Sequence, residues 1–152
     1  MKLYLVQHGH AVDKDVDPDR PLSDAGHREV ERVAQFLEQA RTQVPMVWHS
    51  GKTRAQQTAE ILAARLGARA ELHPGLEPKD DPGAVIADVA LFARDVVVVG
   101  HLPQLSLLAA LLLRAKRDHE PVKFQRGGVA ALESENGSAW QLCWMIVPEL
   151  LP

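Results

Sequence analysis

The stretch Val96-Val97-Val98-Val99-Gly100-His101-Leu102-Pro103 decides the fold. Four β-branched residues in succession favour a strand that is covered on both faces, because a strand with one wet face alternates apolar with polar residues. The stretch therefore predicts a central strand over residues 96–99. A loop follows at residues 100–103, and we expect the apolar residues after it to form a helix that ends near Lys116.

Strand and helix patterns alternate on both sides of this stretch. Short apolar runs predict strands at 3–6, 46–48 and 68–73, and helical spacing predicts helices at 24–41, 53–66 and 84–93. After residue 121 the period changes, and residues 122–133 and 139–147 are predicted to form two antiparallel strands joined by a turn at 135–137. This alternation predicts a three-layer α/β/α protein with a mostly parallel central sheet, in a single domain over residues 1–152.

Composition excludes several classes of protein. The 152 residues contain 17 Lys and Arg against 20 Asp and Glu, a net charge of -3, which argues against nucleic-acid binding through a basic surface. The most apolar segment, 102–113, is interrupted by polar residues and is shorter than the roughly 20 residues of a membrane span. Cys143 is the only cysteine and no signal peptide is visible, so we expect a cytoplasmic protein.

Polar side chains follow three of the predicted strands. His8 follows the first strand, His49 the second and His101 the valine strand, while Arg54 falls in the first turn of a helix. Because ligands bind outside the carboxyl ends of parallel strands, we expect His8, His101 and Arg54 to share one edge of the sheet. Unpaired amides at the helix starts would add to a site for a phosphate-sized anion.

Each of these residues also has an ordinary structural interpretation. A histidine in an α/β protein is usually a surface group or a hydrogen-bonded core residue, and Arg54 is equally compatible with an ion pair. His8 and His101 differ from the other histidines because each directly follows a buried strand and adjoins a glycine, which lets the backbone approach a ligand. The ordinary interpretation is kept for His27, His49, His73 and His119.

Four segments carry recognisable motifs: LVQHGHA at 5–11, RPLSDAG at 20–26, SGKTRAQQTA at 50–59 and VGHLP at 99–103. In order and spacing they resemble the histidine phosphatase (phosphoglycerate mutase-like) superfamily, and in particular its small SixA-type branch of phosphohistidine phosphatases. An RHG-like motif alone is weak evidence, whereas the combination is specific and spans nearly the whole chain. The resemblance implies the phosphoglycerate mutase-like fold.

The resemblance also implies a mechanism. His8 would accept the phosphoryl group as a phosphohistidine intermediate, with its other nitrogen held protonated by a backbone carbonyl near Gly9. Arg54 would hold two phosphoryl oxygens, and His101, as a cation, would balance the charge on them. These side chains supply the positive charge, so the resemblance implies no metal and no other cofactor.

Gln7, Gly9, Arg20 and Leu102 are the further residues that the resemblance places beside the phosphate or substrate. Gln7 departs from the family, whose motif has arginine at this position. Hydrogen bonds to charged groups contribute roughly 1.5–3 kcal/mol, so the loss of that charge would slow the reaction about tenfold to a hundredfold. His10 is a second departure, since many relatives carry an acid there.

The length of the chain indicates which class of substrate the pocket can accept. The chain has about the minimum length for the fold, so we expect a shallow, open pocket. None of the acidic residues at 77, 80 and 81 matches a general-acid motif. A phosphoramidate needs less acid assistance than an ester, because its imidazole leaves more readily than an alkoxide. We therefore favour hydrolysis of phosphohistidine on a protein, such as a phosphotransfer (HPt-like) domain.

Three alternatives remain open. A small phosphorylated substrate would make the protein a phosphomonoesterase, and Gln7 is compatible with a protein that binds phosphate or phosphohistidine without turnover. His8, His10 and Asp13 also resemble part of a metal site. That pattern belongs to (β/α)₈ barrels of roughly 250 residues, for which this chain is too short, and the remaining ligands are missing.

Overall fold

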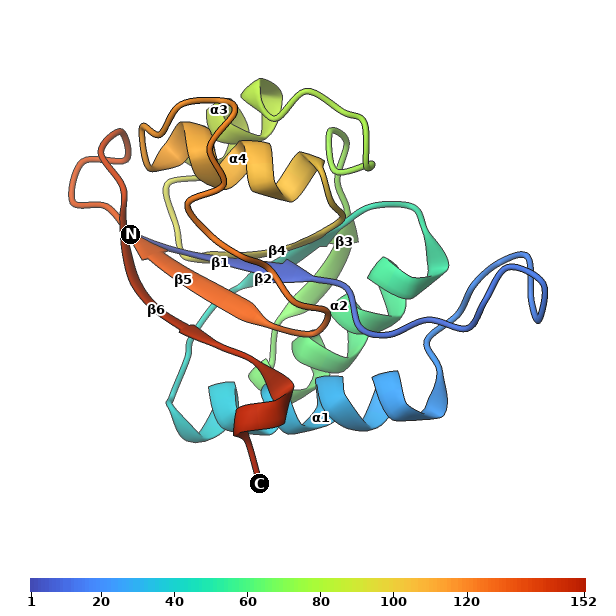
Figure 1. The fold of residues 1–152 in the computed structure, drawn as a ribbon. Coiled ribbons are helices and arrows are strands. Elements are labelled where there is room, and N and C mark those ends of the chain that lie inside the picture. The colour runs from blue at the N-terminus through green and yellow to red at the C-terminus, as the bar shows by residue number, and fades with distance from the viewer.

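The central sheet has six strands in the order β3-β2-β4-β1-β5-β6. The computed structural model describes all 152 residues (Figure 1). Strands β1 to β4 are parallel, while β5 pairs antiparallel with β1 and with β6. Their bounds are β1 Lys2–Gln7, β2 Met46–His49, β3 Arg69–Leu72, β4 Val96–Gly100, β5 Val129–Glu133 and β6 Gln141–Ile146. The predicted mostly parallel sheet is confirmed.

Helices cover both faces of this sheet, as predicted. Figure 1 shows α1 and α2 on one face and α3 and α4 on the other. The helices are α1 Asp24–Gln39, α2 Thr53–Leu66, α3 Gly83–Phe92 and α4 Gln104–Leu112, with a 3₁₀ turn at Pro148–Leu150. None of these helices is long and apolar enough to cross a membrane.

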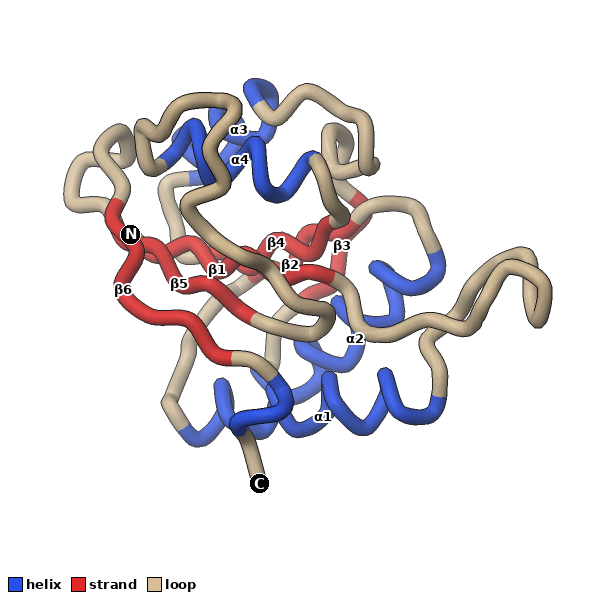
Figure 2. The backbone as a smooth tube through the Cα atoms, in the orientation of Figure 1, coloured by secondary structure: helices blue, strands red, loops and turns tan.

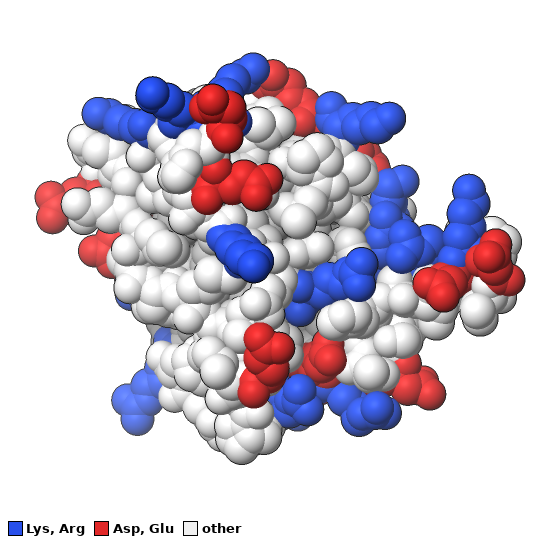
Figure 3. Space-filling model, viewed as in Figure 1, with Lys and Arg blue, Asp and Glu red and all other residues white.

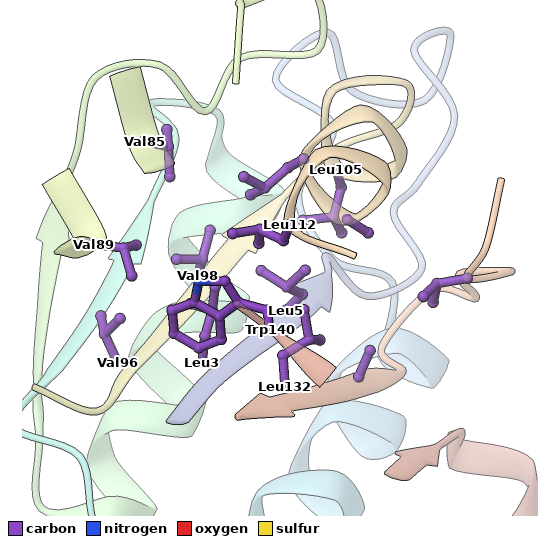
Figure 4. Close-up of a cluster of buried hydrophobic side chains, with 14 of the residues drawn as sticks. Leu3, Leu5, Val85, Val89, Val96, Val98, Leu105, Leu112, Leu132 and Trp140 are labelled. Atoms are coloured by element: carbon purple, nitrogen blue, oxygen red, sulfur yellow. The ribbon is translucent and has the colours of Figure 1, made fainter. Parts of the chain in front are cut away.

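The four valines of β4 are buried because the strand lies in the middle of the sheet and both of its faces are covered. Val96 and Val98 belong to the hydrophobic cluster under α3 and α4, where Leu105 is also buried (Figure 4). Val97 and Val99 belong to the cluster under α1 and α2. Successive strand residues point to opposite faces, so a strand between two cores needs apolar residues at every position.

Helix α4 ends earlier than predicted, at Leu112 rather than near Lys116. Arg114 adopts a left-handed backbone conformation with φ of 56°, and the amide of Ala115 donates to the carbonyl of Ala110. This is the Schellman arrangement that closes many helices. Glycine usually occupies the left-handed position, and its absence here explains why the sequence pattern did not indicate the end.

The prediction of a strand beginning at residue 122 was also wrong, because β5 begins only at Val129. Residues 122–128 form a loop that crosses the α4 face of the sheet (Figure 2). Val122 and Phe124 are buried in the core, so the loop shows the two-residue alternation of a strand without pairing as one. The chain then turns at Gly127, whose φ is 74°.

Candidate active site

The carboxyl ends of β1 and β4 bring the predicted catalytic side chains together. Gln7 of β1 pairs with Gly100 of β4, so His8 and His101 leave the sheet side by side. Their ring centroids are 4.9 Å apart, with 48° between the ring planes. Arg54, in the first turn of α2, donates from Nε to Nε2 of His8 over 3.4 Å. The structure therefore unites the three residues predicted to act together.

Two contacts fix the protonation of the His8 ring. Nδ1 lies 2.8 Å from the carbonyl oxygen of Gly9, which only accepts, so Nδ1 carries the proton. Nε2 accepts from Arg54 and therefore keeps its lone pair. Burial lowers the pKa of His8 to about 4, and the charges of Arg54, Arg126 and Arg20 act in the same direction. The ring is thus neutral at pH 7, with Nε2 available as a nucleophile.

Close packing holds Gly9 in place beneath this ring. A Cβ atom on Gly9 would lie 2.7 Å from the side chain of Val30, so only glycine lets the loop approach α1 this closely. The amide of Gly9 donates to Oγ1 of Thr58 over 3.0 Å, and that hydroxyl donates to the carbonyl of Arg54 over 2.8 Å. Thr58 therefore links the loop of His8 and Gly9 to the turn of α2 that carries Arg54.

His101 is buried and held from one side only. Its Nε2 lies 2.6 Å from Oγ of Ser50, while its Nδ1 is buried without a hydrogen-bond partner. Burial is the main cause that lowers the pKa of His101 to about 3, and the nearby His8, Arg54 and Lys52 act in the same direction. The protein's own groups therefore keep the ring neutral when no anion is bound. A negative charge brought by the substrate is needed to protonate it.

The first amides of α4 were expected to remain free for an anion, and this expectation was wrong. The amide of Gln104 donates to the carbonyl of Pro78, and the amide of Leu105 donates to the carbonyl of His101. At α2, Lys52 in the N-cap position provides no side-chain cap. Neither helix has a side-chain cap, but the carbonyl of Pro78 accepts from the start of α4 in place of one.

Gln7 and Leu102, the chain neighbours of His8 and His101, line a cavity of about 450 Å³ whose walls do not include the two histidines themselves. We call it the carboxyl-end cavity; it is lined by Gln7, His10, Glu29, Arg32, Leu102, Phe124, Gln125, Arg126, Pro148 and Glu149. Only 8% of Gln7 is exposed, and its Oε1 is buried without a partner. Leu102 is 41% exposed on the cavity wall. The wall of the cavity thus contains both the unpaired amide oxygen of Gln7 and the apolar side chain of Leu102.

Arg20 lies near the site but is tethered. Its Nε donates to the carbonyl of Val12 over 3.1 Å, and its backbone has a φ of 48°. Among the neighbouring charges, that of Arg20 contributes most to lowering the pKa of Arg54, after the larger effect of burial. The remaining nitrogens of the Arg20 guanidinium form no hydrogen bond within the protein.

The sequence interpretation did not single out Arg126 or Lys52 at this site, whereas Glu77 was expected in a loop that approaches it. Figure 3 shows Lys and Arg side chains gathered where β1 ends and α2 begins. Arg126 and Lys52 also contribute positive charge to the site, since Arg126 lowers the pKa of His8 and Lys52 lowers the pKa of His101. Glu77 faces the site from the loop after β3, where it accepts from the amide of Gly51 and lies 3.5 Å from the amine of Lys52.

Three other histidines have structural partners of their own and do not contact His8 or His101. His49 contacts the carbonyl of Ser50, and His73 stacks on Trp48. His10 binds Glu29 at 2.7 Å. The structure brings together no group of three or more His, Cys, Asp or Glu residues that could hold a metal ion.

Residues 3–78 match the family model of the histidine phosphatase superfamily, branch 1. The chain belongs to this superfamily. Two relatives support the assignment over most of the chain. An uncharacterized protein of Picosynechococcus sp. is 35% identical over 143 residues, which cover 88% of this chain and 86% of that one. The phosphohistidine phosphatase SixA of Escherichia coli K12 is 31% identical over 153 residues, with 93% of each chain covered.

Solved structures agree with this assignment. The protein histidine phosphatase SixA complexed with tungstate superposes with a TM-score of 0.88, 27% identity and 99% of each chain covered. The histidine phosphatase is thus of the SixA type, with the phosphoglycerate mutase-like fold. A mycobacterial glucosyl-3-phosphoglycerate phosphatase superposes with a TM-score of 0.71 over 94% of this chain and 98% of its own. At 19% identity, that likeness concerns the fold alone.

Proposed function

We propose that this phosphatase hydrolyses phosphohistidine on a protein through a covalent phospho-His8 intermediate. One observation carries the proposal: Nε2 of His8 keeps its lone pair, with Nδ1 held on the Gly9 carbonyl and Arg54 beside it. The similarity to a phosphohistidine phosphatase along 93% of both chains supports the substrate. The proposed unit is a single domain over residues 1–152, and its exposed, unpaired Cys143 supports a reducing cytoplasm.

In the first step, Nε2 of His8 attacks phosphorus and the bond between phosphorus and the substrate's imidazole nitrogen breaks. The substrate ring leaves as a neutral imidazole when its other nitrogen carries a proton. The reaction therefore needs no general acid, unlike the hydrolysis of a phosphate ester, whose leaving alkoxide must be protonated. The Gly9 carbonyl stabilises the positive charge that develops on the His8 ring, because it accepts from Nδ1. Water then attacks the phospho-His8 group, which releases phosphate and restores the neutral ring.

Arg54 and Arg20 are proposed to bind the phosphoryl oxygens, since their guanidinium groups are close enough for the charge of Arg20 to lower the pKa of Arg54. His101 is proposed to donate from its unpartnered Nδ1. A phosphoryl dianion beside this ring raises its pKa, which allows His101 to become the cation that balances the charge. The start of α2, without a side-chain cap, adds the positive end of a helix dipole.

Side chains supply the positive charge in this scheme, so we also propose that the reaction needs no metal. Treatment with EDTA should leave the rate within about twofold of the untreated protein, which is within ordinary assay variation. A loss that Mg²⁺ or Zn²⁺ restores would show that a metal takes part.

The substrate is tested by comparing rates on a phosphorylated HPt domain and on a sugar phosphate. We expect kcat/KM to be at least a hundredfold higher on the HPt domain, and His8→Ala to abolish turnover on both. Turnover that survives in His8→Ala would place the nucleophile elsewhere. Saturable binding of the phosphorylated domain without turnover by the wild type would identify a binding protein instead.

A small-molecule phosphomonoesterase is the second candidate, and Glu77 favours it. Of the three acidic residues expected near the site, Glu77 faces it, while Asp80 and Asp81 cap backbone amides of their own loop. A carboxyl group there could protonate an alkoxide. Under this second candidate, Glu77→Gln lowers the rate on a sugar phosphate at least tenfold, whereas hydrolysis of phosphohistidine does not depend on this residue.

A further inference from the structure

We propose that Arg126 binds the phosphoryl group on the Gln7 side of the site and supplies the positive charge that Gln7 lacks. The inference deepens the proposed function and rests on it, because it concerns the same phosphate site. It starts from the amide of Gln7, which is nearly buried, uncharged and without a partner for its oxygen. Such a group at the edge of an anion site leaves one side of the anion without a cation.

A β-turn directs Arg126 toward this side. The amide of Gly128 donates to the carbonyl of Gln125 over 2.9 Å, and Gly127 has a φ of 74°. This is the pattern of a type II turn, with Arg126 in its first corner position and glycine in the second, where a positive φ is required. The corner residue of such a turn projects its side chain away from the loop.

The same turn is clamped onto the strand that carries the nucleophile. The amide of Gly127 donates to the carbonyls of both Gln7, at 2.9 Å, and His8, at 3.2 Å. A Cβ atom on Gly127 would lie 3.1 Å from Pro148 on its other side. The backbone next to Arg126 is therefore fixed against the end of β1.

The side chain of Arg126 is available to a ligand. It lines the carboxyl-end cavity together with Gln7 and Leu102, and it forms no ion pair within the protein. Its charge acts on both His8 and Arg54, since it lowers the pKa of each. Arg32 lines the same cavity from α1, but its charge is not among those that act on His8. Arg126 is thus the better placed of the two.

The test measures the affinity for inorganic phosphate and for tungstate by titration calorimetry, together with kcat/KM. Arg126→Gln should weaken phosphate binding and lower kcat/KM by about tenfold to a hundredfold, the range expected for one charged hydrogen bond. Lys123→Gln is the matched control, because Lys123 is an exposed cation of the same loop. It should change neither quantity by more than about twofold.

A double substitution tests whether the charge of Arg126 takes the place of an arginine at position 7. Gln7→Arg alone should raise kcat/KM, and Arg126→Gln added to Gln7→Arg should cost much less than it costs in the wild type. Equal effects of Arg126→Gln and Lys123→Gln would overturn the inference, since Arg126 would then act only as general surface charge. A loss on Arg32→Gln without one on Arg126→Gln would also overturn it.

The two proposals fail in different ways. If the wild type shows no turnover but Arg126→Gln still weakens phosphate binding, the catalytic proposal fails and this inference stands. If turnover is present and Arg126→Gln leaves binding and rate unchanged, the inference fails while the proposed function stands. Because Arg126 is exposed, its substitution should leave the thermal unfolding temperature unchanged.

Discussion

The two ends of the sheet carry cavities that differ in volume and in the residues that line them. At the amino ends of β1 and β4, a cavity of about 550 Å³ is lined by Lys2, Tyr4, Phe36, Ala40, Arg41, Thr42, Gln43, Asp95, Trp144, Met145 and Ile146. We call it the amino-end cavity. The carboxyl-end cavity is smaller, at about 450 Å³, yet it adjoins the proposed chemistry. The size of a cavity is therefore a poor guide to function in this molecule.

The two ends of the sheet differ in whether their buried polar atoms have hydrogen-bond partners. In the amino-end cavity, Asp95 accepts from the amide of Lys2 over 2.7 Å, and Trp144 contacts the rings of Tyr4 and Phe36. The four buried side-chain atoms without a partner lie elsewhere, in Gln7, Arg32, His101 and Gln104. Two of these residues line the carboxyl-end cavity and two follow β4. Buried polar groups are normally satisfied, so this concentration marks the end of the sheet built for a ligand.

The largest effect is expected from Arg54→Ala, which removes the guanidinium beside Nε2 of His8. Removal of one charge-stabilising donor costs about 10²–10³-fold in rate. We expect kcat/KM on phosphohistidine to fall by that factor, measured by phosphate release. Arg65→Ala is a control on the same helix, since Arg65 pairs with Glu31 and Glu38 away from the site. Similar losses in both variants would mean that helix stability, and not phosphate binding, is being measured.

The pH dependence of stability should also arise at the carboxyl end. The pKa of His8 is about 4 in the folded protein and near 6.5 in the unfolded chain, so the unfolded chain binds the proton first as the pH falls. Stability is therefore fully present above pH 6.5 and is lost as the pH falls toward 4, by about 3 kcal/mol for this ring.

Denaturant unfolding at several pH values and NMR titration of the imidazoles check this expectation. Neither His8 nor His101 should titrate between pH 8 and pH 5, and inorganic phosphate should move the midpoint of His101 upward. A midpoint near 6.5 for either ring without phosphate would show that the rings are not buried as described.

A smaller loss of activity is expected when the hydrogen bonds of Thr58, which connect Gly9 to Arg54, are removed. Thr58→Val keeps the shape of the side chain but leaves the amide of Gly9 without its acceptor. An unsatisfied buried group costs about 1–3 kcal/mol, so we expect that loss in the free energy of unfolding and about a tenfold fall in kcat. Thr58→Ser should restore both, because the hydroxyl returns. Loss of stability with unchanged kcat would show that Thr58 does not position His8.

The smallest effect on the rate should come from the amino-end cavity. Trp144→Ala removes two aromatic contacts, and we expect it to lower the free energy of unfolding by about 1–2 kcal/mol. Its kcat/KM should stay within about twofold of the wild type, measured at a temperature where both are folded. A large fall in rate would show that the two ends of the sheet are coupled.

The sequence could predict those parts of the fold and site that depend on topology. Four valines in β4 require cover on both faces, as in a parallel sheet, and a parallel sheet brings the carboxyl ends of its strands to one edge. His8 and His101 follow directly from this arrangement, and Arg54 follows from the short turn between β2 and α2. Each of these residues lies within a few positions of a strand whose place was clear.

The rest depended on packing that the sequence pattern does not record. Arg126 was missed because residues 122–133 were expected to form one strand, although Gly127-Gly128 is a turn signal within that range. The neutral state of His101 without a ligand was not predicted, because burial and the surrounding charges lower its pKa and both depend on the assembled site. The local sequence pattern therefore predicted most helices and strands, whereas the pKa values of the site depend on which side chains the folded protein brings together.

The central claim is that the phosphoryl group passes through Nε2 of His8. The most direct test is rapid acid-free quenching of the protein during turnover of a ³²P-labelled phosphorylated HPt domain, followed by mapping of the labelled peptide. We expect acid-labile, base-stable label on His8, and none in His8→Ala. Label on another residue, or turnover with no labelled protein under conditions that trap the intermediate, would contradict the account.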